Sequence, residues 1–258
     1  MIVIAHLSDL HIDEDARSAE RTRAVLAYLE GLPYDLDAVL VTGDIADHAA
    51  PAEYQRAREL LASRHPVLLC PGNHDDRAAF RRFLLGEVPT GQADPTAPVN
   101  QRYQLPGGAV LALCDSSVPG KDEGFLADGT LAWLDGVLTE APHGVPVLVA
   151  FHHPPAELYV PFVDGLRQFG AERLAELAGR HANLTAFLVG HAHTAAATTF
   201  AGRPLLVAPG VVSTLRLPWE HHAHPRDVVH LDQPPALAFH LLDEAGRLTT
   251  HYRTVQLP

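Results

Sequence analysis

The feature of this sequence that most constrains its fold is a set of short apolar runs, each followed by Asp, Asn or His. Apolar runs of this length are typical of buried strands, and the stretches between them carry apolar residues at helical spacing. Strands that alternate with helices indicate βαβ units and a largely parallel sheet. The runs are residues 2–7, 38–42, 67–70, 147–151 and 184–189.

The intervening segments predict the remaining secondary structure. Three hairpins with Gly-containing turns are expected over residues 102–114, 194–207 and 236–255. Parallel units combined with hairpins indicate an α/β fold with mixed sheets. We expect a single domain over residues 1–258, to which about residues 210–258 add loops and strands. Helices are expected over residues 17–29, 52–63, 77–85, 128–138 and 166–178.

Composition narrows the class of protein. Asp and Glu outnumber Lys and Arg by 31 to 19, which gives a formal net charge of −12. Duplex DNA requires a positive surface, so we expect no duplex nucleic acid as a partner. No run approaches the roughly 18 apolar residues that span a bilayer, and the first run has no basic flank. We therefore expect a cytoplasmic protein without a membrane span, in which Cys70 and Cys114 are buried thiols.

The polar residues after the strands predict one common site. The carboxyl ends of parallel strands share one edge of a sheet, where ligands bind. Any one of these residues alone would be explained as a turn residue, a helix cap or a hydrogen-bonded core histidine. No structural need accounts for all five strand ends together. The residues are Asp9, His11, Asp44, Asn73, His74, His152, His191 and His193.

The donor types predict a pair of transition-metal ions. Imidazole, carboxylate and amide donors without thiolate suit Mn, Fe, Zn or Co. Seven donors, which are the residues above without His74, are too many for one ion with open positions. Two ions ~3.5–4 Å apart that share a carboxylate would use all seven, and such a pair stabilises displacement at phosphorus.

These motifs resemble the five blocks of the calcineurin-like metallophosphoesterases. The resemblance covers most of the chain and implies two mixed sheets packed face to face with helices outside, a four-layer αββα sandwich. Asp75, His153-Pro154-Pro155 and Thr194 make the chain similar to the bacterial class III 3′,5′-cyclic nucleotide phosphodiesterases, a branch that also contains glycerophosphodiesterases. The matching blocks are Asp9-x-His11, Gly43-Asp44, Gly72-Asn73-His74-Asp75, His152 and Gly190-His191-x-His193.

The resemblance also implies a role for each residue. Asp44 would bridge both ions together with a water or hydroxide, and His74 would face the phosphate and aid the leaving oxygen. A water shared by two cations has a lowered pKa and supplies hydroxide near neutral pH. The first ion would be held by Asp9, His11 and His193, and the second by Asn73, His152 and His191.

Local spacing supports these roles. Asp9 and His11 are two residues apart, as are His191 and His193, so extended backbone beyond each strand would aim both members to one side. Glycines before Asp44, Asn73 and His191 would permit a crowded backbone.

Several nearby residues have more than one interpretation. Asp47 and Asp75 are both candidates to orient His74 or a metal-bound histidine. His153 is explained equally well as a neighbour of the site and as a packed, hydrogen-bonded histidine. The cluster of His221, His222 and His224 is explained either as a solvated loop, which we favour, or as a loop over the metals.

We therefore expect a metal-dependent phosphodiesterase that acts on small phosphodiesters, foremost 3′,5′-cyclic nucleotides such as cAMP, by attack of the bridging hydroxide. A glycerophosphodiesterase, a phosphomonoesterase and a nucleotide-lipid pyrophosphatase are alternatives with the same chemistry. A non-catalytic metal-containing scaffold is an alternative of another class, which retention of all seven donors and His74 disfavours. The expected partner is the small phosphodiester substrate, and the chain is compatible with a homodimer.

Overall fold

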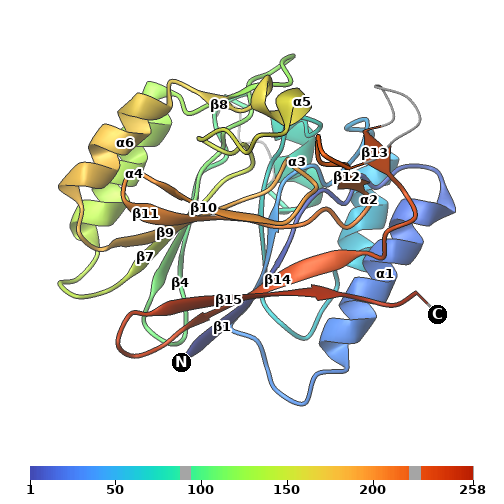
Figure 1. The fold of residues 1–258 in the computed structure, drawn as a ribbon, viewed down its shortest axis with the longest axis horizontal. Helices are drawn as coiled ribbons and strands as arrows, with labels where there is room; N and C mark the ends of the chain where they lie inside the picture. Colours follow the sequence, from blue (N-terminus) through green and yellow to red (C-terminus); the bar gives the residue numbers. More distant parts are fainter. Residues whose placement is uncertain (88–93, 221–227, 258) are drawn as a thin grey trace.

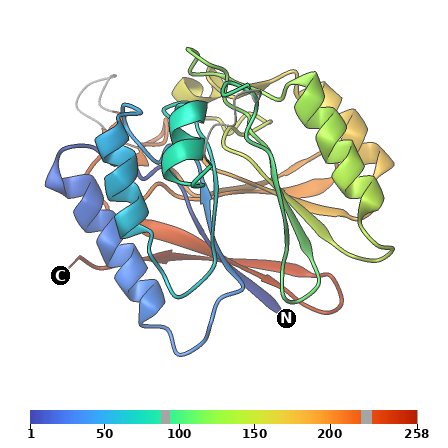
Figure 2. The same ribbon diagram turned by 180° about the vertical axis from the view of Figure 1, so that it is seen from behind.

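The computed structural model describes residues 1–87, 94–220 and 228–257. Two main sheets pack face to face, and helices cover the outer face of each (Figure 1). Seen from behind, the helices again flank the two sheets on opposite sides of the molecule (Figure 2). The four-layer αββα sandwich expected from the sequence is confirmed.

The first sheet joins the two ends of the chain, because β14 lies antiparallel beside β1 in the order β15-β14-β1-β2-β3. Helices α1, α2 and α3 pack on its outer face. Its strands are β1 (Ile2–Leu7), β2 (Ala38–Thr42), β3 (Val67–Cys70), β14 (Ala236–Leu242) and β15 (Leu248–Thr254). The helices are α1 (Ala16–Glu30), α2 (Pro51–Leu60) and α3 (Arg77–Phe83).

The second sheet has the order β10-β11-β9-β7-β5-β4, with a parallel centre and an antiparallel strand at each edge. Helices α4 (Asp128–Glu140) and α6 (Ala171–Arg180) cover its outer face. Its strands are β4 (Gln101–Gln104), β5 (Val110–Leu113), β7 (Val147–Ala150), β9 (Leu184–Val189), β10 (Ala196–Phe200) and β11 (Arg203–Val207). Shorter elements are β6 (Gly124–Phe125), α5 (Pro161–Asp164), β8 (Gln168–Phe169), β12 (Thr214–Leu215) and β13 (Val229–His230).

The space between the sheets is filled by aliphatic side chains from both. Ile4 and Leu40 of the first sheet share this layer with Leu111, Leu148 and Leu188 of the second, and all five are fully buried. Other apolar side chains of both sheets pack against the outer helices. Burial on both faces explains why the central strands read as continuous apolar runs rather than as alternating sequences.

Most expected elements are present, but one helix begins later than predicted. The three predicted hairpins form as β4–β5, β10–β11 and β14–β15. The helix predicted from residue 166 begins only at Ala171, because Gln168 and Phe169 pair with β6. Gly170, with φ of 65°, turns the chain between this short strand and the helix.

The first sheet also carries a buried pair of histidines, His6 on β1 and His240 on β14. Their rings meet through His6 Nδ1 and His240 Nε2 at 2.9 Å. Burial lowers the pKa of His240 to about 3. Burial, followed by the charge that His240 would carry, lowers the pKa of His6 well below its ordinary value. Both rings are therefore neutral in the folded chain near neutral pH.

This pair should make the fold sensitive to mild acid. In the unfolded chain, His240 binds a proton below pH ~6.5. In the folded chain it stays neutral until about pH 3. The free energy of unfolding therefore decreases as the pH falls from about 6.5 towards 3. When the pH is lowered from 7.5 to 5.5, the free energy of unfolding of the wild type should fall by about 1.4 kcal/mol more than that of His240→Gln. Urea unfolding with EDTA present measures the difference, and equal losses in both proteins would contradict the prediction.

Candidate metal centre

The candidate residues lie in the loops after five strands, and backbone hydrogen bonds join these loops within each sheet, the loop after β1 to that after β2 and the loop after β7 to that after β9. The Asp9 amide donates to the Gly43 carbonyl at 3.2 Å, and the His11 amide donates to the Asp44 carbonyl at 2.9 Å. In the second sheet, the Gly190 amide donates to the His152 carbonyl at 2.9 Å. Asp9 and Asp44, which follow strands of the first sheet, have donor atoms within 4.8 Å of His152, which follows a strand of the second, so both sheets contribute to one site.

Within the described residues, the candidate ligands and their neighbours form four overlapping groups of donor atoms, two of which are His152 with His153 and His191, and His11 with Asp44 and His74. Asp9, His11 and His193 each place a donor atom within 4.8 Å of the others, and the same holds for Asp9, Asp44 and His152. Asp44 Oδ2 lies 3.2 Å from His152 Nε2 and 3.5 Å from His11 Nε2. Asp44 thus lies between His11 and His152, the two histidines that the resemblance assigns to different ions.

Three histidines have one ring nitrogen held by the protein and the other directed into the site. His11 Nδ1 meets Asp47 Oδ1 at 2.7 Å, and His152 Nδ1 donates to the Thr42 carbonyl at 2.6 Å. His193 Nδ1 meets Ser213 Oγ at 2.8 Å. Such contacts fix the tautomer and the ring orientation of metal-binding histidines. Neither Ser213 nor the Thr42 carbonyl was predicted from the sequence pattern.

Several buried polar atoms at this edge have no hydrogen-bond partner within the described part of the chain. They are both carboxylate oxygens of Asp9, the Asn73 Oδ1 and the His191 Nε2. An unsatisfied buried polar atom costs about 1–3 kcal/mol, and a charged one costs more. Oxygen and imidazole nitrogen are donors for first-row transition metals. The residues present therefore fit a metal centre that would satisfy all of these atoms.

The protonation states match this fit. Burial by itself would raise the pKa of the Asp44 carboxyl, but its interaction with His152 holds that pKa well below its ordinary value. Burial would likewise lower the pKa of His152, yet Asp44 and then Asp9 raise it to about 9. Burial, followed by the charge of His152, lowers the pKa of His191 to about 3. The carboxylates of Asp44 and Asp9 thus favour positive charge at this point. A bound cation would supply that charge.

The backbone at the ligands differs from the prediction. Extended geometry was expected to align Asp9 with His11, but both residues are left-handed, with φ of 56° and 43°. His191 and His193 are also left-handed, with φ of 67° and 52°, and Asp44 has φ of 49°. Asp, Asn and His tolerate this conformation better than other non-glycine residues. Such conformations cost about 1–3 kcal/mol each and persist where the surroundings enforce them.

Glycines make room for the crowded turn after β2, as expected from the sequence. A Cβ on Gly43 would lie 2.6 Å from His152 Nδ1 and 2.7 Å from the Gly72 amide. Gly43 also has φ of 86°, which side chains disfavour. A Cβ on Gly72 would collide with Asp44. The loops that carry Asp44, Asn73 and His152 can therefore approach one another only with glycine at these places.

Comparison with known proteins identifies the family. A family model described as calcineurin-like phosphoesterase matches residues 2–195, more than half of the 258 residues. The chain belongs to the calcineurin-like phosphoesterase family. It is therefore a metallophosphoesterase, and its His and Asp clusters agree with the binuclear metal site of that family.

Individual relatives have two kinds of activity in their names. This phosphoesterase is 36% identical over 224 residues to the glycerophosphodiester phosphodiesterase GpdQ of Enterobacter lignolyticus, covering 82% of this chain and 78% of that protein. It is 35% identical over 226 residues to a probable cyclic nucleotide phosphodiesterase of Rhodococcus erythropolis, covering 82% and 71%. A dimetal phosphatase from Danio rerio shares its fold, with a TM-score of 0.72, 18% identity, and coverage of 98% and 96%.

His74 lies at the rim of the phosphoesterase site rather than among its buried donors. Its Nδ1 donates to the Asp47 carbonyl at 2.7 Å, and its ring stands edge-on to His11 with centroids 4.5 Å apart. The Asp47 carboxylate lies 3.6 Å from the same Nδ1 and also holds His11. Of the two carboxylates considered from the sequence, Asp47 is the one beside His74.

Asp75 instead stabilises the turns after β2 and β3 by hydrogen bonds to their backbone. Its carboxylate accepts from the amides of Gly72, Ile45 and Ala46 at 2.9–3.2 Å. Burial, followed by the nearby Asp44, raises the pKa of Asp75 to about 6. Its role is therefore to join the turn after β2 to the turn after β3.

His153 is a packed histidine. Its Nδ1 meets Ser116 Oγ at 2.8 Å, and its Nε2 lies 3.2 Å from the Asp122 carbonyl. It is fully buried, and both ring nitrogens have partners within the chain. The hydrogen-bonded interpretation of His153 thus agrees with the structure, and so does its interpretation as a neighbour of the site, because its ring centroid lies 4.6 Å from that of His191. His221, His222 and His224 lie outside the described residues.

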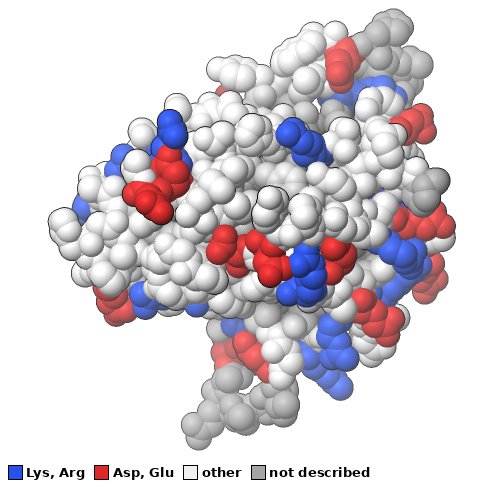
Figure 3. Space-filling model, turned by 90° about the horizontal axis from the view of Figure 1, so that it is seen from below, with Lys and Arg blue, Asp and Glu red and all other residues white. Residues whose placement is uncertain are grey.

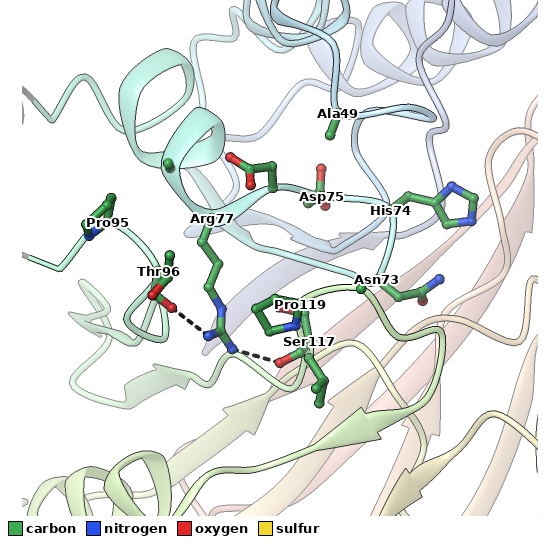
Figure 4. Close-up of a pocket in the computed structure, with 13 residues that line it drawn as sticks. Ala49, Asn73, His74, Asp75, Arg77, Pro95, Thr96, Ser117 and Pro119 are labelled. Atoms are coloured by element: carbon green, nitrogen blue, oxygen red, sulfur yellow. Dashed lines mark hydrogen bonds between the residues drawn. The ribbon is translucent and has the colours of Figure 1, made fainter.

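Two pockets flank the site. One, of about 240 Å³, borders Asn73 and His74 and is walled by the loops that contain Thr96 and Ser117. Arg77 donates to the carbonyls of both loop residues and so ties these walls together (Figure 4). The other pocket, of about 300 Å³, borders His11 and His193, and its lining includes three carboxylates, Asp13, Asp15 and Asp47, and one guanidinium, Arg17.

The outer surface offers no extended positive stripe on the face seen in Figure 3, where acidic and basic side chains are interspersed. Within the described residues, no helix is both long enough and apolar enough to cross a membrane. Cys70 and Cys114 are buried and unpaired, as expected.

Adjacent histidines 152 and 153 allow a matched test of the site. The metal-loaded wild type should contain close to two transition-metal ions per chain. His152→Gln should lose about one ion, because Gln cannot present a nitrogen donor with imidazole geometry, whereas His153→Gln should retain both. Elemental analysis after Mn loading, with circular dichroism as the check on folding, provides the measurement. Equal metal loss in the two variants would refute the distinction.

Proposed function

We propose that this phosphoesterase is a binuclear metal-dependent phosphodiesterase that hydrolyses small phosphodiesters, foremost 3′,5′-cyclic nucleotides such as cAMP. The observation that carries the proposal is the set of buried donor atoms on Asp9, Asn73 and His191 that have no hydrogen-bond partner in the described part of the chain, together with Asp44 between His11 and His152. A non-catalytic scaffold would not need His74 at the rim of such a site.

In this proposal the residues divide between two ions. Asp44 lies between the two groups and would contact both. The two ions, when bound, supply positive charge for the phosphate oxygens and lower the pKa of a water molecule. Asp9, His11 and His193 would hold one ion, and Asn73, His152 and His191 would hold the other.

His74 is proposed as the catalytic residue on the leaving-group side. The Asp47 carbonyl accepts from its Nδ1, so Nε2 is the nitrogen that remains for a ligand. A protonated ring would donate from Nε2 to the departing oxygen, which is general acid catalysis. The pocket beside Asn73 and His74 has room for the departing alcohol.

Charge favours diesters over monoesters at this site. Carboxylates outnumber guanidinium groups by three to one in the lining of the second pocket, and the chain has a net charge of −12. A diester carries one negative charge, whereas a monoester carries up to two near neutral pH, so repulsion by these carboxylates is weaker for the diester.

A glycerophosphodiester is the second candidate substrate, and the 36% identity to GpdQ favours it. The relative from Rhodococcus, at 35% identity, favours a cyclic nucleotide. The two differ in the alcohol that leaves. In the cyclic nucleotide this alcohol stays tethered to the product, whereas the glycerophosphodiester releases a separate small alcohol.

Replacement of His74 should separate catalysis from metal binding. His74→Ala should lower kcat by ~10²–10⁴-fold on substrates with a poor leaving group, because the general acid is removed. The loss should be smaller on bis(p-nitrophenyl) phosphate, whose leaving group needs no proton. Steady-state kinetics on both substrates, with metal content as the control, test this. Equal losses on both would make His74 a phosphate-binding or structural residue.

A substrate panel tests the choice of phosphodiester. With Mn added, kcat/KM should be higher for cAMP and for bis(p-nitrophenyl) phosphate than for p-nitrophenyl phosphate, and duplex DNA should be hydrolysed little. A glycerophosphodiester belongs in the same panel. A preference for the monoester would overturn the phosphodiesterase proposal, and a strong preference for the glycerophosphodiester would change the substrate alone.

A further inference from the structure

A continuous chain of buried polar contacts crosses the first sheet and ends at the metal centre. His240 on β14 contacts His6 on β1, and His6 Nε2 contacts Thr42 Oγ1 on β2 at 2.8 Å. Thr42 Oγ1 in turn contacts Ser8 Oγ at 3.0 Å. Alternate residues of a strand share a face, so His6 lies on the same inner face as Ile4, and Thr42 on the same face as Leu40. The chain thus lies in the layer between the two sheets.

The chain reaches His152 through one carbonyl oxygen. Ser8 Oγ donates to the Thr42 carbonyl at 2.9 Å, and His152 Nδ1 donates to the same carbonyl at 2.6 Å. At its other end, His240 Nδ1 contacts Thr250 Oγ1 on β15 at 2.8 Å. The Thr42 carbonyl is therefore held by a network on one side while it orients a candidate ligand on the other.

The direction of every hydrogen bond in this chain follows from its end. A carbonyl oxygen only accepts, so the Ser8 hydroxyl donates its single hydrogen to the Thr42 carbonyl. The Thr42 hydroxyl must then donate its own hydrogen to Ser8 Oγ. Thr42 Oγ1 then accepts from His6 Nε2–H. With both rings neutral, His6 Nδ1 accepts from His240 Nε2–H, and His240 Nδ1 accepts from Thr250. Only one placement of the hydrogens therefore gives every hydrogen bond in this network one donor and one acceptor.

Ser8 and Thr42 also pack against the glycine that precedes a second candidate ligand, His191. A Cβ on Gly190, which precedes His191, would lie 2.9 Å from both the Ser8 Cβ and the Thr42 carbonyl oxygen. Displacement of Ser8 or Thr42 would therefore disturb His191 as well as His152. These two residues belong to the same proposed ion, whereas His11 and His193 are held by Asp47 and Ser213.

We propose that His6, His240 and Thr42 are positioning residues for one of the two metal sites, the one assigned to Asn73, His152 and His191. They do not touch metal or substrate; they hold the Thr42 carbonyl in the place where it fixes His152 with Nε2 toward the site. The inference rests on the proposed function, since it takes His152 as a ligand. Loss of such a supporting contact typically costs 10–100-fold in metal affinity.

Metal titration of the EDTA-treated, dialysed protein tests this without an activity assay. Wild type should show two Mn²⁺-binding steps by isothermal titration calorimetry. Thr42→Val keeps the shape but removes the hydroxyl, and it should weaken one step by ~10–100-fold and leave the other unchanged. Thr42→Ser keeps the hydroxyl and should bind like wild type. His240→Leu should resemble Thr42→Val.

His65→Leu is the matched control for the loss of a buried imidazole. His65 is buried, and its ring contacts the Leu36 amide and the Leu29 carbonyl away from the site. This variant should be less stable but keep both binding steps. If Thr42→Val and His240→Leu lowered only the melting temperature, or if His65→Leu weakened metal binding as they do, the inference would be overturned. A wild type that binds fewer than two ions would overturn the proposed function itself.

A spectroscopic measurement tests the network in the unaltered protein. Long-range ¹H–¹⁵N correlation spectra distinguish the two neutral tautomers of a histidine ring. His6 and His240 should both carry their hydrogen on Nε2. A hydrogen on Nδ1 of either ring would break the deduced sequence of donors and would overturn the inference.

Discussion

Two buried carboxylates, on Asp9 and Asp44, are the constraint around which this edge of the molecule is organised. Burial of a negative charge is costly unless positive charge compensates for it. Asp44 lies close to the imidazoles of His11 and His152, and both oxygens of Asp9 lack hydrogen-bond partners among the described residues. A cationic centre at this point would stabilise the arrangement, and it would also supply the positive charge that a bound phosphate group requires.

The candidate ligands are held by left-handed turns and close loop contacts rather than by the extended backbone of an ordinary strand end. Five of the candidate ligands are left-handed residues, and glycines allow their loops to approach closely. Backbone hydrogen bonds between the loops after β1 and β2 fix these turns. Each oriented histidine then depends on a partner outside the ligand set, such as Asp47, Ser213 or the Thr42 carbonyl.

The interior of the sandwich has two parts with different roles. Most of the layer between the sheets is aliphatic and supplies the burial that stabilises the fold. Toward the site, the same layer becomes polar, with His6, His240 and Thr42 in mutual contact. A polar network in a low-dielectric interior is rigid when all of its members are satisfied. The structure thus places rigid polar contacts where geometry matters most.

The sequence by itself determined which elements form and which residues gather at one edge. Apolar runs buried on both faces mark the strands, and the parallel order brings their carboxyl ends together, so Asp9, Asp44, His152 and His191 were predictable as neighbours. The order of the motifs also indicated the family. These features depend on local pattern and chain topology, which a sequence records directly.

Only the tertiary structure decided how the donors converge and what holds them. Extended backbone was the expected cause of the pairing of Asp9 with His11, whereas left-handed turns produce it. The choice of Asp47 rather than Asp75 beside His74 depends on contacts between separate loops. The contact between His6 and His240 joins residues 234 positions apart. No local pattern encodes such pairings, because they arise from the packing of one strand against another.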